Sequence, residues 1–336
     1  MIEEVASDLY RVEIPLLGNP LRSINSYILK GQERNLIIDT GMNREECLEA
    51  MRTGLKRLGV DLRKTDFFIT HFHVDHLGLV ANLVDDHSTV YLSQADADRF
   101  HEVVFGTLWS DMIQYTRSNG FPENELKEAL PNHPACLYGV KEPLPFRLVR
   151  DGDSVGIGNY LFRCLETPGH TKGHMCLYEP HAKMLVSGDH ILNDITPTVS
   201  MRTDDGNPLR EYLASLAKVE ALEIDLVLPG HRNIFKNYRE RIDELRSHHR
   251  KRLNEICSIL EGGGKNAYEV ASRMRWDVTY DSWDLFPAQQ KWFATGEAMS
   301  HLKYLEEQGM IRTEIQDQKI LFSLGFSHQA TKGREK

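Results

Sequence analysis

Short apolar runs alternate with amphipathic helical patterns along the first 95 residues of the chain. The runs are rich in β-branched residues and are bounded by glycine, proline and asparagine, which is typical of strands. Where apolar residues instead recur every three or four positions, the pattern predicts a helix with one buried face. The expected strands are 9–16, 26–30, 35–40, 67–70 and 89–92, and the expected helices are 44–58 and 77–84.

A second series of the same kind follows after residue 159. The expected strands are 160–166, 175–178, 183–187 and 225–228, with a helix at 208–222. Strands and helices thus occur in two similar halves. This pattern predicts an α/β fold in which two sheets pack face to face and the helices lie outside.

A helical stretch separates the two halves, at about 96–131. It is rich in large apolar side chains: Phe100, Phe105, Trp109, Met112 and Tyr115. Such enrichment marks interfaces as well as cores. Two interpretations therefore stay open, an ordinary packed insertion or a segment that forms a lid or a dimer contact.

The chain beyond residue 236 has a different pattern. A long charged helix at 237–260 ends at three glycines, and helices at 266–275 and 288–308 precede a hairpin turn at 316–318. Helix, helix, then hairpin is the order of a winged helix. The predicted domains are a catalytic domain over 1–236 that includes the insertion, a linker helix with a winged-helix-like domain over 237–326, and a flexible tail over 327–336.

The charge balance argues against a nucleic-acid partner. The 336 residues carry a formal net charge of −9. Between 265 and 325 there are seven lysines and arginines and nine aspartates and glutamates, a net of −2. A nucleic-acid footprint is basic, so we expect the C-terminal domain to form a dimer contact or a wall of the substrate pocket.

Cysteine usage and the N-terminal sequence favour a cytoplasmic protein. The five cysteines are scattered and form no C-x-x-C pair, which predicts reduced core residues. The chain opens with Met1-Ile2-Glu3-Glu4, which is acidic where a signal peptide is basic. No apolar run is long enough to span a bilayer, so we expect no membrane association.

Candidate chemistry is concentrated in the run Thr70-His71-Phe72-His73-Val74-Asp75-His76. The run follows an apolar strand and precedes a helical pattern, so it is predicted to be a loop at the carboxyl end of a strand. Such loops are where α/β folds place their ligands. Imidazoles and carboxylates are the usual ligands of zinc at catalytic sites.

Three further turns end in a residue of ligand type. Each turn contains a glycine and follows an apolar strand, so the backbone can bend sharply there. The residues in question are His170 in Thr-Pro-Gly-His, Asp189 in Ser-Gly-Asp-His and His231 in Leu-Pro-Gly-His. One such turn would be weak evidence, but together with the 70–76 run they predict a single metal site.

The H-x-H-x-D-H run, followed by a histidine, an aspartate and a last histidine, resembles the metallo-β-lactamase superfamily over about residues 8–235. The resemblance implies an αββα sandwich with two divalent metal ions at one edge of the sheets, zinc first and iron or manganese as alternatives. It implies that His71, His73 and His170 hold one ion, that Asp75, His76 and His231 hold the other, and that Asp189 bridges both. It also implies that Asp39, in Ile-Asp-Thr-Gly, supports the ligands from behind.

Departures from the family pattern narrow the subgroup. Class B1 β-lactamases carry a cysteine where Asp189 stands, which argues against antibiotic hydrolysis. Flavodiiron proteins have a glutamate in place of His73. The tail beyond residue 237 resembles the winged-helix domain of some short hydrolases of the superfamily and differs from the helical tail of glyoxalase II.

The expected activity is hydrolysis of a small or medium ester, thioester or lactone by a hydroxide that bridges two metal ions. Asp75 is the expected proton acceptor, and His190 is a candidate proton donor or a structural histidine. His174 is similarly ambiguous, and His248 and His249 are interpreted as a solvated helix face. The alternatives are a metal-dependent phosphodiesterase or ribonuclease and a mono-iron persulfide dioxygenase.

Overall fold

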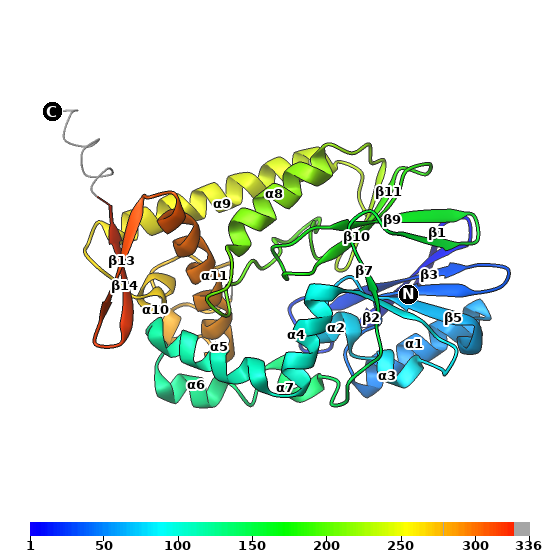
Figure 1. Cartoon of the computed structure of the whole chain (residues 1–336), viewed down its shortest axis with the longest axis horizontal. Coiled ribbons are helices and arrows are strands. Elements are labelled where there is room, and N and C mark those ends of the chain that lie inside the picture. The colour runs from blue at the N-terminus through cyan, green and yellow to red at the C-terminus, as the bar shows by residue number, and fades with distance from the viewer. Residues whose placement is uncertain (278, 326–336) are drawn as a thin grey trace. The chain divides into compact units, whose positions relative to one another are not determined.

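The computed structural model describes residues 1–277 and 279–325, which fall into two compact units (Figure 1). The first unit comprises residues 1–105, 134–197 and 214–242. The second unit comprises residues 106–133, 198–213 and the chain from 243 onward. Helices α8 (Pro208–Glu220) and α9 (Tyr238–Leu260) contribute residues to both units.

The first unit contains a seven-stranded sheet whose strands follow one another in chain order. Its strands are β1 (Ile2–Ala6), β2 (Leu9–Pro15), β3 (Ser23–Lys30), β4 (Asn35–Ile38), β5 (Thr65–Phe68), β6 (Val90–Ser93) and β7 (Arg147–Val149). Strands β1 to β4 pair antiparallel, whereas β4 to β7 pair parallel. The parallel strands β4 and β5 therefore end at the same edge of the sheet.

A five-stranded sheet completes the first unit. Its strands are β8 (Ser154–Ile157), β9 (Tyr160–Glu166), β10 (Met175–Glu179), β11 (Met184–Gly188) and β12 (Leu226–Pro229). The spatial order is β12-β11-β10-β9-β8, and only the pair of β11 and β12 is parallel.

Alternating side chains of both sheets form the shared core between them. Tyr27 and Phe68 of the first sheet belong to the same buried cluster as Phe162 and Leu177 of the second. Each of these four side chains is at most 1% exposed. Since neighbouring residues of a strand point to opposite faces, the residues next to them face outward to the helices.

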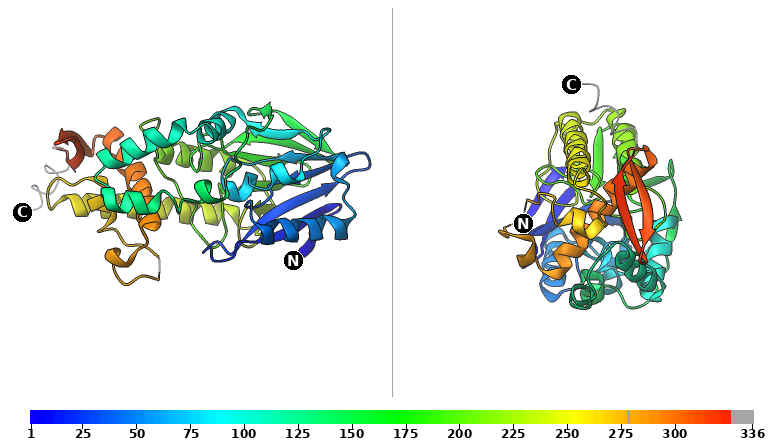
Figure 2. Two further views of the ribbon diagram at one scale, coloured as in Figure 1. Left: turned by 90° about the horizontal axis from the view of Figure 1, so that it is seen from below. Right: turned by 90° about the vertical axis from the view of Figure 1, so that its left-hand side faces the viewer.

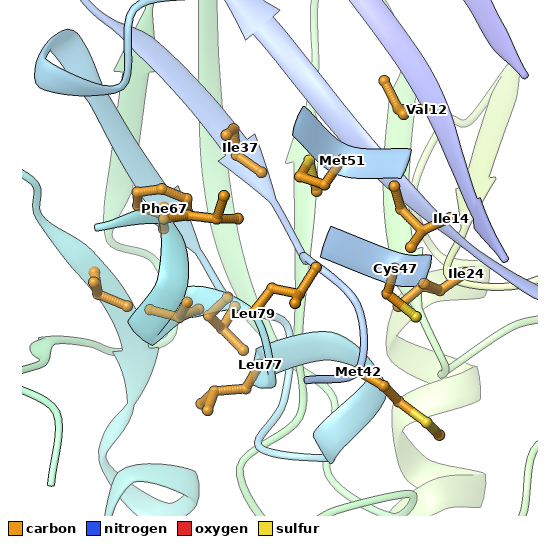
Figure 3. Close-up of a cluster of buried hydrophobic side chains, with 14 of the residues drawn as sticks. Val12, Ile14, Ile24, Ile37, Met42, Cys47, Met51, Phe67, Leu77 and Leu79 are labelled. Carbon is orange, nitrogen blue, oxygen red and sulfur yellow. The ribbon is translucent and has the colours of Figure 1, made fainter. Parts of the chain in front are cut away.

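Helices cover the outer face of the first sheet. Cys47 and Met51 of α1 (Glu45–Leu58) pack against Val12, Ile14 and Ile37 (Figure 3). Removing a buried side chain of this kind costs about 2–5 kcal/mol. The other helices of this unit are α2 (Val74–Leu77), α3 (Val80–Leu83), α4 (Gln94–Val104), α7 (Pro134–Tyr138) and the short 3-10 helix η1 (Leu62–Lys64).

The end of α8 lies close to the start of α9 in the first unit (Figures 1 and 2). The Tyr178 hydroxyl on β10 donates a hydrogen bond to the carbonyl of Glu223, just after α8, at 2.9 Å. The Tyr238 hydroxyl on α9 donates to the carbonyl of Leu222. These bonds anchor the segment after α8 to both the second sheet and α9.

The second unit is mainly helical. Its remaining elements are α5 (Thr107–Ser118), α6 (Glu123–Ala129), α10 (Ala267–Ala271), η2 (Trp283–Leu285), α11 (Ala288–Glu307) and the hairpin β13 (Ile311–Gln316) with β14 (Lys319–Leu324). Lys291 of α11 and the Tyr268 hydroxyl of α10 both bind the Glu125 carboxylate of α6, at 2.7 and 3.0 Å. Helix α6, which belongs to the predicted 96–131 insertion, thus packs against α10 and α11 of the same unit.

The predicted α/β class and most predicted elements are confirmed. Strands β1, β7 and β8 and helix α7 were not predicted. His249 was interpreted as solvated, but it is 1% exposed and contacts His301. The chain order of α10, α11 and the hairpin agrees with a winged helix, although that assignment and the division at residue 236 stay predictions. The predicted tail at 327–336 lies outside the described residues.

Candidate metal centre

The seven candidate ligands follow the ends of four strands in the first unit. The run from His71 to His76 comes after β5, and His170 comes after β9. Asp189 follows β11 directly, and His231 follows β12 by two residues. One difference from the expected loop is local: His73 is the N-cap of α2, so Asp75 and His76 lie on a helical turn.

His71, His73 and His170 form what we call the first ligand group. Each offers a ligand atom within 4.8 Å of the other two. Nδ1 of His73 lies 3.0 Å from Nε2 of His71 and 3.0 Å from Nε2 of His170. Two nitrogens bound to one zinc ion at about 2.0–2.1 Å lie about 3.3 Å apart in a tetrahedral site. The spacing therefore fits a single small divalent ion.

Asp75, His76 and His231 form the second ligand group, within the same 4.8 Å limit. The Asp75 carboxylate lies 3.3 Å from Nε2 of His231. A carboxylate with two imidazoles is a donor set that zinc, iron and manganese all accept.

Asp189 lies between the two groups. Its carboxylate oxygens are 3.6 Å from Nε2 of His170 and 3.5 Å from Nε2 of both His76 and His231. His71, His76 and Asp189 also form a convergent set of their own, which takes one member from each group. The structure thus brings all seven predicted ligands together, in two adjoining groups joined by one carboxylate.

Hydrogen bonds at the far side of three rings fix which nitrogen faces the centre. Nδ1 of His231 donates to the carbonyl of Ser23 at 2.7 Å, and Nδ1 of His76 lies 2.7 Å from Asp39. Nδ1 of His71 lies 3.1 Å from the Thr70 hydroxyl. With the proton held at Nδ1, Nε2 of each ring keeps its lone pair for a metal ion.

Buried polar atoms with no hydrogen-bond partner test the fit to a metal. Nε2 of His76, Nε2 of His231 and one carboxylate oxygen of Asp189 are buried and without a partner. Unpaired buried polar atoms are costly and need an explanation. His76 shares one convergent set with Asp189 and another with His231, so cations bound at these sets would satisfy the three atoms, and the residues fit the metal that the sequence implies.

The charges of the cluster also favour a cation. Burial would raise the pKa of Asp189, but His231 and His76 outweigh it and lower that pKa well below its usual range. Burial would lower the pKa of His76, but the carboxylates of Asp39, Asp189 and Asp75 raise it well above its usual value. The carboxylates therefore stay ionised, and protons compete with metal ions for the histidines.

Asp39 holds the cluster from behind, as expected. It follows β4 and has a backbone φ of 56°, a conformation that is uncommon outside glycine. Its carboxylate accepts from the Thr70 amide and the Thr70 hydroxyl, both at 2.8 Å, and contacts His76. Asp39 thereby fixes the start of the ligand run as well as one ligand ring.

Gly230 is required by the closeness of the groups around it. A Cβ atom at this position would lie 2.6 Å from an Asp189 oxygen and 2.9 Å from Cε1 of His76. Any side chain there would displace ligands of the centre. The glycine before His231 therefore serves close approach of the backbone.

His174 supports the centre through the backbone. Its Nε2 accepts from the Asp189 amide at 3.1 Å, and its Nδ1 lies 2.8 Å from the Thr167 hydroxyl. The ring is buried, and burial lowers its pKa well below the usual value. A neutral His174 thus positions the residue that lies between the two ligand groups.

His190 is also buried, and burial lowers its pKa to about 3. The ring is therefore neutral at pH 7 before any substrate or metal is considered. Its role as a proton donor stays a prediction.

Sequence reasoning missed Asp96, on α4. This carboxylate is 0% exposed and binds both the 70–76 run and the turn that carries His170. In the sequence, Ser93 followed three residues later by Asp96 has the form of a helix N-terminus, and the Asp96 amide does bind the Ser93 hydroxyl at 3.3 Å. This local pattern accounts for Asp96 as part of a helix start and gives no sign of its contacts with the two ligand segments.

Residues 19–231 match the sequence profile of the metallo-beta-lactamase superfamily, so the chain belongs to this superfamily of metal-dependent hydrolases. Two solved structures are similar over nearly the whole chain. A metallo-beta-lactamase family protein from Thermus thermophilus has 26% identity and a TM-score of 0.79, covering 96% of this chain and 100% of its own. A beta-lactamase domain protein from Burkholderia ambifaria has 25% identity and a TM-score of 0.80, covering 96% and 95%.

Curated relatives are more distant in sequence. The beta-lactamase-like protein 2 homolog of Caenorhabditis elegans is 25% identical over 247 residues, which is 72% of this chain and 66% of that protein. The probable metallo-hydrolase YqjP of Bacillus subtilis is 24% identical and covers 88% of this chain and 92% of its own. The human acyl-coenzyme A thioesterase MBLAC2 is 27% identical over 63% of this chain and 74% of its own.

None of the helices that the structure describes is long and apolar enough to cross a membrane.

Proposed function

We propose that this chain is a two-metal hydrolase, with zinc as the first candidate metal, that acts on a small or medium ester, thioester or lactone. One observation carries the proposal: two convergent ligand groups adjoin each other and share Asp189 between them. A single-metal enzyme would need only one of these groups. Two ions at such a site together bind both sides of a reacting bond.

In this proposal, each ligand group holds one ion and Asp189 contacts both. When bound, the ions supply an activated water at neutral pH and polarise a substrate carbonyl. The chain itself contributes the orientation of the rings, because Asp39, Thr70 and the Ser23 carbonyl hold the Nδ1 side of three of them.

Asp75 is the proposed proton acceptor as well as a ligand. Burial would raise the pKa of its carboxyl, but His76 and His231 outweigh burial and lower it. The carboxylate is therefore ionised at neutral pH and can take up a proton. His190 is the candidate proton donor to the leaving group. The alternative is a structural histidine, and the neutral state of the buried ring favours that alternative.

The comparison with thioesterases supports an acyl substrate. MBLAC2 proteins of cattle, chicken and human are named acyl-coenzyme A thioesterases and are 26–27% identical to this chain. The net charge of −9 also argues against a polynucleotide substrate, because phosphate backbones bind to basic surfaces. Among the three acyl classes we therefore place thioesters first.

A substrate panel with metal analysis tests the proposal. Protein purified without added metal is assayed by elemental analysis, then with acyl-CoA thioesters, p-nitrophenyl esters, a lactone, bis-p-nitrophenyl phosphate and single-stranded RNA. We expect two ions per chain and hydrolysis of an acyl substrate that Asp75→Ala abolishes. Faster cleavage of RNA or the phosphodiester would favour the phosphodiesterase alternative. One iron with oxidation of a persulfide would favour the dioxygenase.

The C-terminal elements have a proposed role that is structural. Their net charge between 265 and 325 is −2, so we propose a dimer contact or a pocket wall rather than a nucleic-acid site. Gel-shift assays at moderate salt are expected to give no complex with duplex DNA or RNA. A salt-sensitive submicromolar complex would overturn this part of the proposal.

A further inference from the structure

Asp96 is a buried carboxylate outside both ligand groups that accepts three hydrogen bonds. One oxygen accepts from the Phe72 amide at 3.0 Å and from the Thr171 hydroxyl at 2.8 Å. The other oxygen accepts from the Gly173 amide at 2.7 Å. Both oxygens are therefore engaged, and neither faces solvent.

The three donors come from the two segments that supply the first ligand group. Phe72 lies between His71 and His73 in the chain, and Thr171 directly follows His170. These segments follow strands of different sheets, β5 and β9. Asp96 is thus a single group that joins the His71–His73 segment to the His170 segment.

Glycine at position 173 allows the backbone to lie close to Asp96. A Cβ atom at position 173 would lie 2.7 Å from the Asp96 carboxylate and would also clash with the Asp96 amide nitrogen. The backbone of the His170 turn therefore approaches Asp96 as closely as a chain without a side chain allows.

We propose that Asp96 is a positioning residue that sets the convergence of His71, His73 and His170, and so the affinity of the first ligand group for its ion. This inference rests on the proposed two-metal function. None of these three donors belongs to Asp75, His76 or His231. The ring of His76 is held by Asp39, and that of His231 by the carbonyl of Ser23. Loss of Asp96 is therefore expected to act on one ion and to spare the other.

Asp96→Asn is the sharpest variant, because it keeps the volume of the side chain. An amide has a single oxygen, and its NH₂ group would face an N–H or O–H donor of one of the two segments. Outer partners of metal ligands typically change metal affinity 10- to 100-fold. We expect one ion to bind about 10- to 100-fold more weakly and the other to change less than about twofold.

The measurement is a competition titration of the metal-free protein against a chromophoric chelator. Asp66→Asn is the matched control: Asp66 is also buried, accepts two bonds from Arg34 and one from the Thr89 amide, and lies in the same unit. We expect this control to bind both ions with unchanged affinity. Equal weakening by the two variants would overturn the proposal.

Two backgrounds assign the weakened ion to a ligand group. In His231→Ala the first group stays complete, so adding Asp96→Asn is expected to weaken the remaining ion about 10- to 100-fold. In His73→Ala the remaining ion belongs to the second group, and adding Asp96→Asn is expected to leave it unchanged. The reverse pattern would overturn the proposal. A wild-type protein that binds no ion would instead refute the two-metal function.

A milder variant and a metal-free measurement cover the case in which Asp96→Asn does not fold. Thr171→Val removes only one of the three donors at nearly constant volume and is expected to weaken the same ion by less. In metal-free protein, Thr171→Val should speed hydrogen exchange of the Phe72 and Gly173 amides, whereas Asp66→Asn should not. Unchanged exchange at both amides would contradict a joint role of these contacts.

Discussion

The two units each bury a cluster of histidines, yet the two clusters are built differently. In the first unit, His71, His76 and His231 are 0% exposed and point one nitrogen of each ring toward shared carboxylates. In the second unit, His249 and His301 are at most 1% exposed, and Nδ1 of His249 lies 3.0 Å from Nε2 of His301. Ring nitrogens also face each other in the first ligand group, but there the Asp189 carboxylate adjoins them, whereas His249 and His301 belong to no set of converging ligand atoms among the described residues.

The neighbouring charges differ as well. Burial lowers the pKa of His301 to about 3, and Arg252 adds to the effect. In the first unit the carboxylates instead raise the pKa of His231 against the effect of burial. Over residues 1–277 and 279–325, sets of three or more converging ligand atoms occur only at the centre in the first unit. Converging carboxylates, rather than buried histidines as such, distinguish a ligand site from a polar core.

Replacing the shared carboxylate should have the largest effect. Asp189→Ala removes a group within 3.6 Å of both ligand groups, so we expect loss of both ions and a rate at least about 1,000-fold lower, equivalent to about 4 kcal/mol. Elemental analysis measures the bound metal, and steady-state kinetics measure the rate. Asp194→Ala, an exposed aspartate of the same unit, is the control and should keep both ions. Full metal content in Asp189→Ala would contradict the comparison.

Removing the metal should come next in size. A ligand that binds only the folded state at 100 times its Kd stabilises that state by about 2.7 kcal/mol per site. A chelator should therefore lower the stability of the wild type by that order, measured by denaturant unfolding. The same chelator should leave Asp189→Ala unchanged. A wild type whose stability ignores the chelator would count against a bound ion.

His301→Ala should destabilise the second unit without affecting the metal. It removes a buried ring and leaves Nδ1–H of His249 unpaired, which together cost about 2 kcal/mol. Denaturant unfolding gives the loss, and elemental analysis should still find two ions. Loss of an ion would show that the two clusters are not independent.

The smallest expected effect is a dependence on pH. Folded His301 takes up a proton only near pH 3, whereas an unfolded histidine does so near 6.5. Between these values the unfolded state binds more protons, so stability falls as the pH falls. From pH 7 to 5.5 this group alone should cost about 1 kcal/mol. Between pH 7 and 5.5, the free energy of unfolding of His301→Ala should therefore fall by about 1 kcal/mol less than that of the wild type. An equal fall in both proteins would exclude this contribution.

The candidate ligands could be found in the sequence because their signals are local. His71, His170, Asp189 and His231 each follow an apolar strand within a few residues, and strand ends meet at one edge of a sandwich. The two sheets were predicted from a local pattern as well, because strands and helices occur in two similar halves of the chain. Strand β1 was not predicted because its five residues include Glu3 and Glu4 and show no clear alternation of apolar and polar side chains.

Residues that act across the fold without a recognisable motif could not be predicted. Asp96 contacts donors 24, 75 and 77 positions away, and no short pattern encodes such distances. His249 lies among charged residues of α9, which suggested a solvated face, but tertiary packing buries it. Local motifs therefore reveal the candidate ligands and Asp39, whereas the role of Asp96 and the burial of His249 become visible only in the tertiary structure.

Each ligand group takes members from both sheets of the first unit. His71, His73, Asp75 and His76 follow a strand of the seven-stranded sheet, whereas His170, Asp189 and His231 follow strands of the five-stranded sheet. Neither sheet alone can assemble a complete group, so we expect metal uptake to follow the docking of the sheets during folding. Refolding with metal added at successive delays would reveal this order, because early addition should not speed the burial of the core. A bound ion would then act as a cross-link between the two sheets that forms only after they have docked.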